Sequence, residues 1–294
     1  MKQPVSDCLM PIGEAAKHPI SKENKTHSLL NLRHQLALME GREQSVRLPF
    51  GVDSLDHALA GGLSLGRVHL ITGNMLGHGA VSGFAVALIR HLQTHFQKAD
   101  SNKPVVWCPA SQHGAAGMLY GHGLAAAGLD PSHILVVESP NPARRLAALE
   151  DIARTDGLAA VLVEYDGMQK SADYWMRLAR RAQLAAEAGN VTVLLLGAPI
   201  PPAGFETAWH IAPSPDLAVR SNPALAGRSI WHIQLQRARG GQPHQCHLSW
   251  YPNSGVFETF DQRTQAKTTP YEDLSVQGRL PLTALSGLPS KAVA

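Results

Sequence analysis

The sequence is poor in cysteine and has no long apolar run. Its 294 residues include only Cys8, Cys108 and Cys246, which are too few and too far apart for a disulfide framework. No stretch approaches the roughly 18 consecutive apolar residues that a membrane span requires. The first residues also lack the apolar core of a signal peptide. These absences predict a cytoplasmic protein that does not enter a membrane.

What the chain does have is enough apolar content for a packed core. Hydrophobic residues make up 44% of it, which excludes global disorder. The net charge is +3 and the pI is near 8.8. A mildly basic chain is compatible with a nucleic-acid partner, but many enzymes have the same balance, so the position of the charges decides more than their sum.

Short apolar segments alternate with longer amphipathic ones through most of the chain. The apolar segments have the length of strands and cover residues 68–72, 105–108, 134–138, 159–163 and 191–196. The helices predicted between them cover residues 80–96, 142–155 and 172–188. Asn141 and Ser171 precede the last two helices and are residue types that cap helices. This alternation indicates a parallel sheet with helices on both faces.

The pattern changes after the fifth strand. Residues 199–223 contain six prolines, which predict neither a helix nor a central strand. The alternating segments 229–237 and 245–251 flank a Gly-Gly turn at 239–242, which is typical of a β-hairpin, and 256–260 is a candidate third strand. The sequence therefore predicts an α/β fold whose mostly parallel sheet ends in an antiparallel β-hairpin edge.

Both ends of the chain differ from this core. Residues 1–45 are interpreted as a flexible arm with a short helix at 29–41, and residues 262–294 as a disordered tail or a segment that folds on a partner. The core domain between them covers residues 46–261. The short helix and the leucine-containing tail segment 280–288 are candidates for self-association or partner docking.

Residues 48–73 resemble the entry of RecA-family ATPases, where a glycine-rich passage leads into the first core strand and the phosphate loop. The matching residues are Gly51, Leu55, Asp56, Leu59, Gly61, Gly62, Leu63, Gly66 and Gly73. Several glycines at fixed offsets around a strand are more specific than an isolated Gly-x-Gly. The resemblance implies a RecA-like α/β domain whose phosphate loop begins at Gly73.

The loop itself lacks the residues that ATP hydrolysis needs. A phosphate loop ends in Gly-Lys-Ser/Thr, because the lysine neutralises the phosphates and the hydroxyl binds Mg²⁺. Those three positions hold His78, Gly79 and Ala80, and no lysine occurs in residues 26–97. The whole degenerate loop consists of Gly73, Asn74, Gly77, His78, Gly79 and Ala80. We expect no catalytic residue, no bound cofactor and no ATP hydrolysis.

The set of acidic residues that an active RecA-type site needs is also incomplete. The second strand continues into Cys108-Pro109-Ala110-Ser111, without the catalytic glutamate of RecA proteins. Glu164 and Asp166 follow the fourth strand and could imitate the acid that holds Mg²⁺ through water. The alternative is that they are strand-end carboxylates that face solvent or a nearby arginine. The sequence leaves both roles open.

A second resemblance lies in the middle of the chain. Residues 121–137 look like the "GLAALGLDPARLL" passage of the ImuA family, and the similarity continues in three later segments. These segments are 147–151, 158–164 and 180–189. With the entry they occur in the family's order and cover residues 48–260, leaving out the arm and the tail. On this collinearity the chain is identified as a member of the ImuA family.

This resemblance implies a process and partners. ImuA-family proteins act with ImuB, an inactive Y-family polymerase homologue, and with an error-prone DnaE-type polymerase. The resemblance therefore implies a non-catalytic role in DNA-damage-induced translesion synthesis and mutagenesis, as part of an SOS response. Two alternatives come from related folds: a SulA-like inhibitor of the division protein FtsZ, and a RecA-type DNA-dependent ATPase, against which the missing lysine argues.

A basic segment follows the fifth strand, where RecA itself holds single-stranded DNA. Residues 217–256 contain no Asp or Glu. The arginines in this segment are Arg220, Arg228, Arg237 and Arg239. Positive charge within reach of phosphates gives sequence-tolerant, salt-sensitive binding, so these arginines are predicted to contact single-stranded DNA. Trp209 and Trp231 are either stacking surfaces for bases or packing residues.

The helix predicted at 172–188 carries a second basic group. Its spacing places Arg177, Arg180 and Arg181 on one face. The opposite face holds Trp175, Leu178, Ala179 and Ala182. The basic face is either solvated or a docking surface for DNA or a protein, and Lys170 lies in the loop before it.

His244, Cys246 and His247 raise the question of a metal site. On a strand His244 and Cys246 share one face while His247 points to the other, and no fourth ligand is evident. We therefore predict no metal.

Overall fold

The computed structural model describes residues 46–73, 78–99, 101–110, 119–139, 141–165, 170–197, 203–214 and 229–260. The elements, in chain order, are β1 (Arg47–Leu48), α2 (Asp53–Ala58), β2 (Leu63–Ser64), β3 (Val68–Gly73), α3 (His78–Lys98), β4 (Val105–Cys108), α4 (Gly121–Ala126), the 3₁₀ helix η3 (Pro131–His133), β5 (Ile134–Val136), α5 (Pro142–Ala153), β6 (Ala160–Glu164), α6 (Ala172–Gly189), β7 (Thr192–Leu196), β8 (Thr207–Pro213), β9 (Ser229–Ala238), β10 (His244–Tyr251) and β11 (Val256–Thr259). The predicted arm with its short helix and the predicted tail lie outside the described residues. No helix in the described part is both long enough and apolar enough to cross a membrane.

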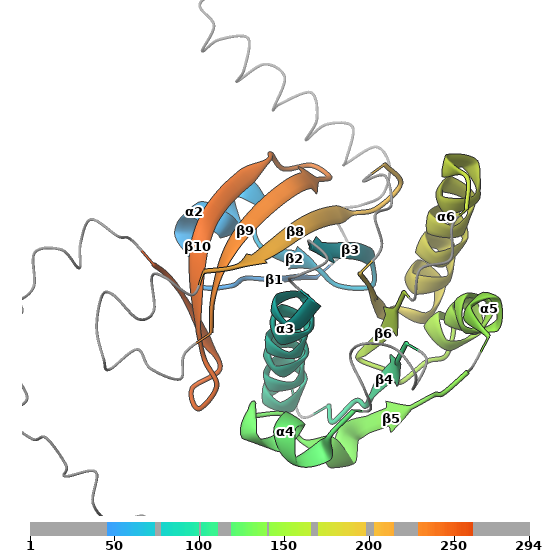
Figure 1. Ribbon diagram of the computed structural model, residues 1–294, viewed down its shortest axis with the longest axis horizontal. Coiled ribbons are helices and arrows are strands. Elements are labelled where there is room, and N and C mark those ends of the chain that lie inside the picture. Colours follow the sequence, from blue (N-terminus) through green and yellow to red (C-terminus); the bar gives the residue numbers. More distant parts are fainter. Residues whose placement is uncertain are drawn as a thin grey trace, which may run out of the picture. The chain divides into compact units, whose positions relative to one another are not determined.

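Nine of the described strands form one sheet in the order β11-β10-β9-β8-β3-β7-β6-β4-β5 (Figure 1). The strands from β8 to β5 in that order pair in parallel, which confirms the predicted parallel sheet. β8, β9, β10 and β11 pair antiparallel, which confirms the predicted hairpin edge and its third strand. The predicted α/β class is therefore confirmed.

The proline-rich segment corrects one prediction. β8 lies inside residues 199–223, yet it is a central strand between β3 and β9. The prolines flank this strand: Pro202 precedes it and Pro213 is its last residue, so residues 203–212 contain none. The prediction treated the proline content as uniform, whereas a proline removes a ladder donor only at its own position.

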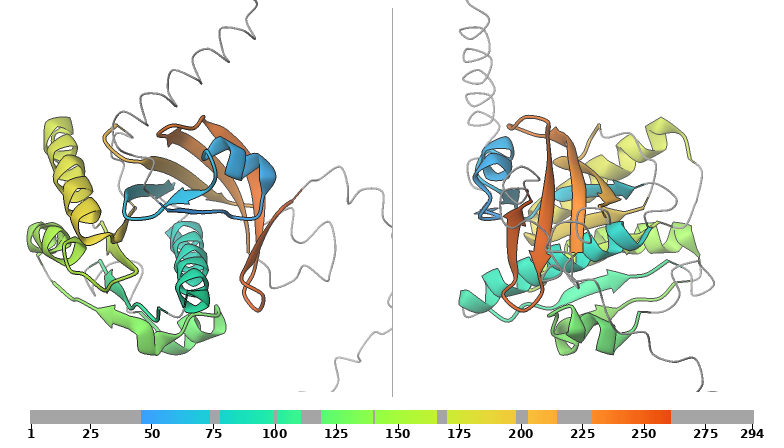
Figure 2. Two further views of the ribbon diagram at one scale, coloured as in Figure 1. Left: turned by 180° about the vertical axis from the view of Figure 1, so that it is seen from behind. Right: turned by 60° about the vertical axis from the view of Figure 1, so that its left-hand side comes forward.

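Helices cover both faces of the sheet (Figures 1 and 2). One apolar cluster packs α3 and α2 against strands that include β3, β9 and β10. The other packs α5 and α6 against β6, β7 and the opposite face of β3. Strands that are buried on both faces read as continuous apolar runs, which explains why they were recognisable in the sequence.

The predicted caps begin two of these helices. The Asn141 side-chain oxygen accepts hydrogen bonds from the backbone N–H groups of Ala143 and Arg144, at 2.9 and 3.3 Å. The Ser171 hydroxyl accepts one from the N–H of Tyr174 at 3.3 Å. Each satisfies donors that the first turn of a helix leaves unpaired.

The RecA-like entry passage has a structural role in this fold. The Asp56 carboxylate accepts hydrogen bonds from the backbone N–H groups of Phe50, Gly51 and Val52, at 2.7, 2.9 and 3.2 Å, and so closes the loop before α2. Gly62 has a φ of 121°, and a Cβ there would lie 2.3 Å from the carbonyl oxygen of Leu48. Only glycine fits that approach.

Candidate functional site

The carboxyl ends of the parallel strands meet at one edge of the sheet, which is where α/β proteins of this kind place their ligands. The edge residues described are Gly73, Cys108, Glu164, Leu196 and Pro213, at the ends of β3, β4, β6, β7 and β8. Asn74, Gly77 and Asp166 lie outside the described residues. The edge therefore offers few side chains for chemistry in the described part of the chain.

The segment predicted to be a degenerate phosphate loop includes the end of β3 and the start of α3, and its residues 74–77 lie outside the described part of the chain. Gly79 is exposed and nothing lies within 4 Å of the place a Cβ would take. The next residue, Ala80, is 8% exposed and belongs to the apolar cluster under α3. At the position where a phosphate loop presents its Mg²⁺-binding hydroxyl, this chain has a methyl group in its core.

The Glu164 carboxylate accepts two hydrogen bonds at this edge of the sheet. One carboxylate oxygen accepts a hydrogen bond from the indole N–H of Trp107 at 2.9 Å, and the other accepts one from the backbone N–H of Ala110, also at 2.9 Å. Both donors belong to β4 or the residues just after it. The sequence left two roles open, an acid that holds Mg²⁺ through water and a strand-end carboxylate that faces solvent or an arginine. In the structure Glu164 is half-buried, and its carboxylate joins β6 to the end of β4.

Cys108, at the end of β4, is the other reactive residue type on this edge. Burial raises the pKa of its thiol to about 11, although Arg145 acts in the opposite direction. Since only the thiolate is an effective nucleophile, the Cys108 side chain is unreactive at neutral pH. It contributes to the apolar cluster under α5 and α6.

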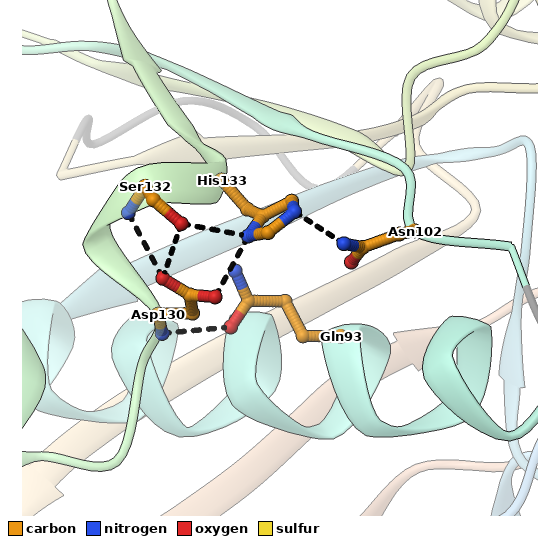
Figure 3. Close-up of polar contacts among 5 residues, drawn as sticks. All are labelled: Gln93, Asn102, Asp130, Ser132 and His133. Carbon is orange, nitrogen blue, oxygen red and sulfur yellow. Dashed lines mark hydrogen bonds and ion pairs between the residues drawn. The ribbon is translucent and has the colours of Figure 1, made fainter.

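A cluster of Asp130, Ser132 and His133 lies away from this edge, at η3 (Figure 3). The Asp130 carboxylate accepts hydrogen bonds from the Ser132 N–H and hydroxyl, at 3.0 and 2.6 Å, which lower the pKa of its carboxyl group. Ser132 Oγ and Asp130 Oδ2 both contact the same ring nitrogen of His133, Nδ1, at 3.1 and 2.8 Å.

That geometry excludes a serine-hydrolase triad, in which serine and aspartate contact different ring nitrogens. His133 Nε2 instead contacts the Asn102 amide nitrogen, and the Asp130 N–H donates to Gln93 Oε1 on α3 at 3.4 Å (Figure 3). The cluster fastens η3 and the start of β5 to α3. The sequence analysis missed it, although the Asp-Pro-Ser-His motif signals an aspartate cap followed by a proline at the first helical position.

The predicted DNA-contacting arginines fall into two groups. Arg220 and Arg228 lie outside the described residues. Arg237 is half-buried on β9, and its Nε donates to the carbonyl oxygen of Phe205 at 3.0 Å. Arg239 is half-buried in the following turn, where its N–H donates to the carbonyl oxygen of Glu206 at 2.8 Å. The hairpin arginines thus lie against the chain that leads into β8.

The tryptophans that were candidates for base stacking are core residues. Trp209 is 0% exposed and Trp231 is 3% exposed. Their rings lie 5.7 and 5.6 Å from that of Phe84 on α3. Neither indole is open to a base, so the packing role that the sequence left open is the one that the structure has.

The other predicted DNA-contacting residues are three arginines on α6 and a lysine just before it. Arg177, Arg180 and Arg181 are exposed. Trp175, Leu178, Ala179 and Ala182 are buried on the opposite face, as the spacing predicts. The Arg181 guanidinium pairs with Glu150 of α5 at 2.9 Å. The Lys170 ammonium lies 5.6 Å from the ring centroid of Tyr174.

The histidines of β10 divide between the two faces of the sheet. Cys246 packs against the apolar cluster of α3, whereas the His247 ring lies tilted against that of His232 of β9, with ring centroids 4.9 Å apart. Burial, followed by the effect of His232, lowers the pKa of His247. Among the described residues, no group of three or more His, Cys, Asp or Glu side chains could hold a metal ion.

Together these features define an α/β protein with a mixed nine-stranded sheet and a strand-end edge whose described side chains serve packing. No model of a known protein family matches the chain. The chain is similar to protein ImuA of two Caulobacter vibrioides strains, NA1000 / CB15N and ATCC 19089 / CIP 103742 / CB 15. Each is 30% identical over 211 residues, which cover 67% of this chain and 80% of the relative. The chain belongs to the ImuA family.

Proposed function

We propose that this protein is a non-catalytic accessory factor in DNA-damage-induced translesion synthesis and mutagenesis, acting in the cytoplasm by binding other molecules. The observation that carries the proposal is Ala80: a member of the ImuA family places a core methyl group where a phosphate loop needs its hydroxyl. The Glu164 carboxylate, with both oxygens bonded to β4 and its continuation, supports the same conclusion. A RecA-like scaffold of this kind would work by association.

The first prediction concerns nucleotide. Purified protein should hydrolyse ATP no faster than a buffer control, with or without single-stranded DNA, because lysine and hydroxyl are missing from the loop. Glu164→Gln should leave that background unchanged but reduce the free energy of unfolding by about 1 kcal/mol, since a carboxylate that accepts two hydrogen bonds becomes a neutral amide. Phosphate release and urea unfolding measure the two effects. DNA-stimulated turnover that Glu164→Gln abolishes would show that this carboxylate is catalytic.

Single-stranded DNA is the proposed nucleic-acid ligand. Residues 217–256 carry four arginines and no carboxylate, and they include the hairpin that follows β8. Lys170 is a further exposed positive charge, just after β6. Arg237 already donates to Phe205, so it would contribute charge rather than a free guanidinium fork. Binding through these groups should be weak and should not depend on base sequence.

The second prediction tests this contact with Arg220 and Arg228, the two predicted arginines that lie outside the described residues. Arg220→Ala/Arg228→Ala should weaken binding to a single-stranded oligonucleotide by about 1 kcal/mol or more and reduce the dependence of affinity on salt. Arg144→Ala/Arg154→Ala removes the same charge from exposed positions at the two ends of α5 and is the matched control. Fluorescence anisotropy at several salt concentrations gives both quantities. Equal affinity of the loop variant and the wild type at every salt concentration would place DNA contact elsewhere.

The proposed protein partners are an ImuB-type inactive polymerase homologue and, through it, an error-prone DnaE-type polymerase. Support comes from family membership and from the packing roles of the strand-end side chains. Self-association is a further proposed mode, through the short helix predicted from the sequence at 29–41 or the leucines of residues 280–288. Isothermal titration of the purified chain with the purified ImuB-type protein tests the central association directly.

A further inference from the structure

The outer face of α6 combines exposed apolar and basic side chains. Met176 is 43% exposed and Leu184 is 45% exposed. Arg180 lies between them at helical spacing, with Arg177 beside it. At a rise of about 1.5 Å per residue, the two apolar side chains are about 12 Å apart along the helix. We call these four residues the α6 stripe.

The remainder of α6 is fixed, so the stripe is presented on a rigid element. The Gln183 side-chain oxygen accepts a hydrogen bond from the N–H of Val68 at 3.2 Å, and Glu187 forms an ion pair with Arg67. Towards its C-terminal end, Arg181 pairs with Glu150 of α5. These contacts hold the helix to β3 and to α5, and they pair Glu187 with Arg67 and Glu150 with Arg181.

The stripe is positively charged, and the described residues show no ion pair to it. Glu187 and Glu150 are occupied by Arg67 and Arg181, and within the described residues no carboxylate pairs with Arg177 or Arg180. Asp173, in the first turn, lies where a negative charge is favoured by the helix N-terminus. A ligand that covers the stripe must therefore bring negative charge together with apolar groups.

Two other occupants fit this surface less well. A second copy of the chain, with two α6 helices packed antiparallel around Arg180, would place Arg180 against its own symmetry mate, and like charges opposed at an interface are unfavourable. Single-stranded DNA would satisfy the arginines, but Met176 and Leu184 offer it no aromatic face on which bases stack. The apolar ends of the stripe favour a protein.

We infer that the α6 stripe is the docking surface for an acidic amphipathic helix of a protein partner. The partner helix places apolar side chains over Met176 and Leu184, and Asp or Glu side chains opposite Arg177 and Arg180. This mode of recognition reads an amphipathic helix by the spacing of its apolar anchors and gives specificity through complementary charge. The inference rests on the proposed accessory function and assigns a surface to it.

The test uses the full chain and a synthetic probe. The probe is an 18-residue helical peptide with leucines along one face and glutamates beside them, and the control peptide has lysines in place of the glutamates. Wild type should bind the acidic peptide at least tenfold more tightly than the basic one in fluorescence anisotropy. Arg177→Glu/Arg180→Glu should reverse that preference. Met176→Ala/Leu184→Ala should lower the affinity for the acidic peptide at least tenfold.

Arg144→Glu/Arg154→Glu makes the same charge change on α5 and should alter neither peptide's affinity. All variants change exposed side chains, and thermal unfolding checks that they remain folded. Failure of the wild type to prefer the acidic peptide would overturn the inference, as would an α6 charge reversal that abolishes oligonucleotide binding and spares the peptide. Binding of the purified ImuB-type protein distinguishes failure of the docking surface from failure of the proposed function. If it binds wild type and α6 variants equally, only the docking surface is wrong, whereas no binding to any form removes the proposed function itself.

Discussion

Gly189→Ala should lower the free energy of unfolding by about 2–4 kcal/mol, because overpacking against backbone cannot be relieved by side-chain movement. Gly189 is the last residue of α6, at its closest approach to the end of α5. A Cβ there would lie 2.2 Å from the carbonyl oxygen of Ala153 and 2.9 Å from the carbonyl carbon of Arg154. The two helices would have to separate, and α6 carries the proposed docking stripe.

Gly79→Ala is the matched control for that result. It makes the same chemical change in another helix, at an exposed position where nothing lies within 4 Å of the new Cβ. Alanine there should stabilise the protein by up to about 1 kcal/mol, since glycine has the greater conformational freedom in the unfolded chain. Urea unfolding of both variants measures the contrast. Equal midpoints for the two variants would mean that α5 and α6 do not meet at Gly189.

Because residue 79 also lies in the degenerate loop, the control has a second use. If the protein does not use nucleotide, Gly79→Ala should leave partner and DNA binding at the wild-type level. The same variant therefore serves as a test of stability and of the proposed absence of nucleotide chemistry.

The sequence revealed the fold because the residues that define it act locally. The strands buried on both faces are short apolar runs, and α5 and α6 each begin one residue after a capping residue, Asn141 or Ser171. The glycines and Asp56 of the entry passage were recognised by their resemblance to RecA-family ATPases. In this structure Asp56 closes a loop and Gly62 allows a close backbone approach. These structural roles are sufficient to explain why the entry passage resembles that of RecA-family ATPases.

The central strand β8 was missed because composition was averaged over a long segment. Six prolines in 25 residues predict irregular structure, but they stand at the two ends of the segment that surround Thr207–Pro213. Inside, Trp209 and Ile211 alternate with residues of the other face and are fully buried. If composition is averaged over a strand's length, about five or six residues, the apolar segment is distinguished from the prolines on either side.

The candidate site was less predictable because its contacts join distant parts of the chain. Trp107 and Glu164 are 57 positions apart, and Arg237 is 32 positions from Phe205. No spacing rule along the chain brings such pairs together, since their proximity depends on the order of strands in the sheet. On α6, by contrast, helical periodicity alone separates the basic face from the buried one.

His69 should make the stability of the protein depend on pH between about 6.5 and 4. Its side chain is fully buried on β3, with Nδ1 2.7 Å from the Thr207 hydroxyl and Nε2 2.9 Å from the Ser64 carbonyl oxygen. The Ser64 carbonyl can only accept, so Nε2 carries the proton and Nδ1 accepts from Thr207. Thr207 Oγ in turn accepts from the indole N–H of Trp209 at 2.6 Å. Every group in this network is satisfied by a neutral imidazole.

Burial in the core lowers the pKa of His69 from 6.5 to about 4. Below pH 6.5 the unfolded chain therefore takes up a proton that the folded chain does not, and the free energy of unfolding falls by about 1.4 kcal/mol per pH unit until the folded pKa is reached. Between pH 7 and pH 4.5 the His69 contribution should fall by about 2–3 kcal/mol. Urea unfolding of wild type and His69→Gln across this range isolates it, since the other titrating groups are common to both proteins.

The stability difference between wild type and His69→Gln should be largest at pH 7 and shrink as the pH falls, because only the wild type loses the contribution of a neutral buried imidazole. The control is His57→Gln, which makes the same substitution at an exposed histidine of α2. A difference for His69→Gln that stays constant from pH 7 to pH 4.5 would show that the buried ring already takes up a proton in the folded protein. The hydrogen-bonded network of Ser64, His69, Thr207 and Trp209 would then need a different arrangement. Both ring nitrogens of a charged imidazole are donors, so the Thr207 hydroxyl could no longer donate to Nδ1.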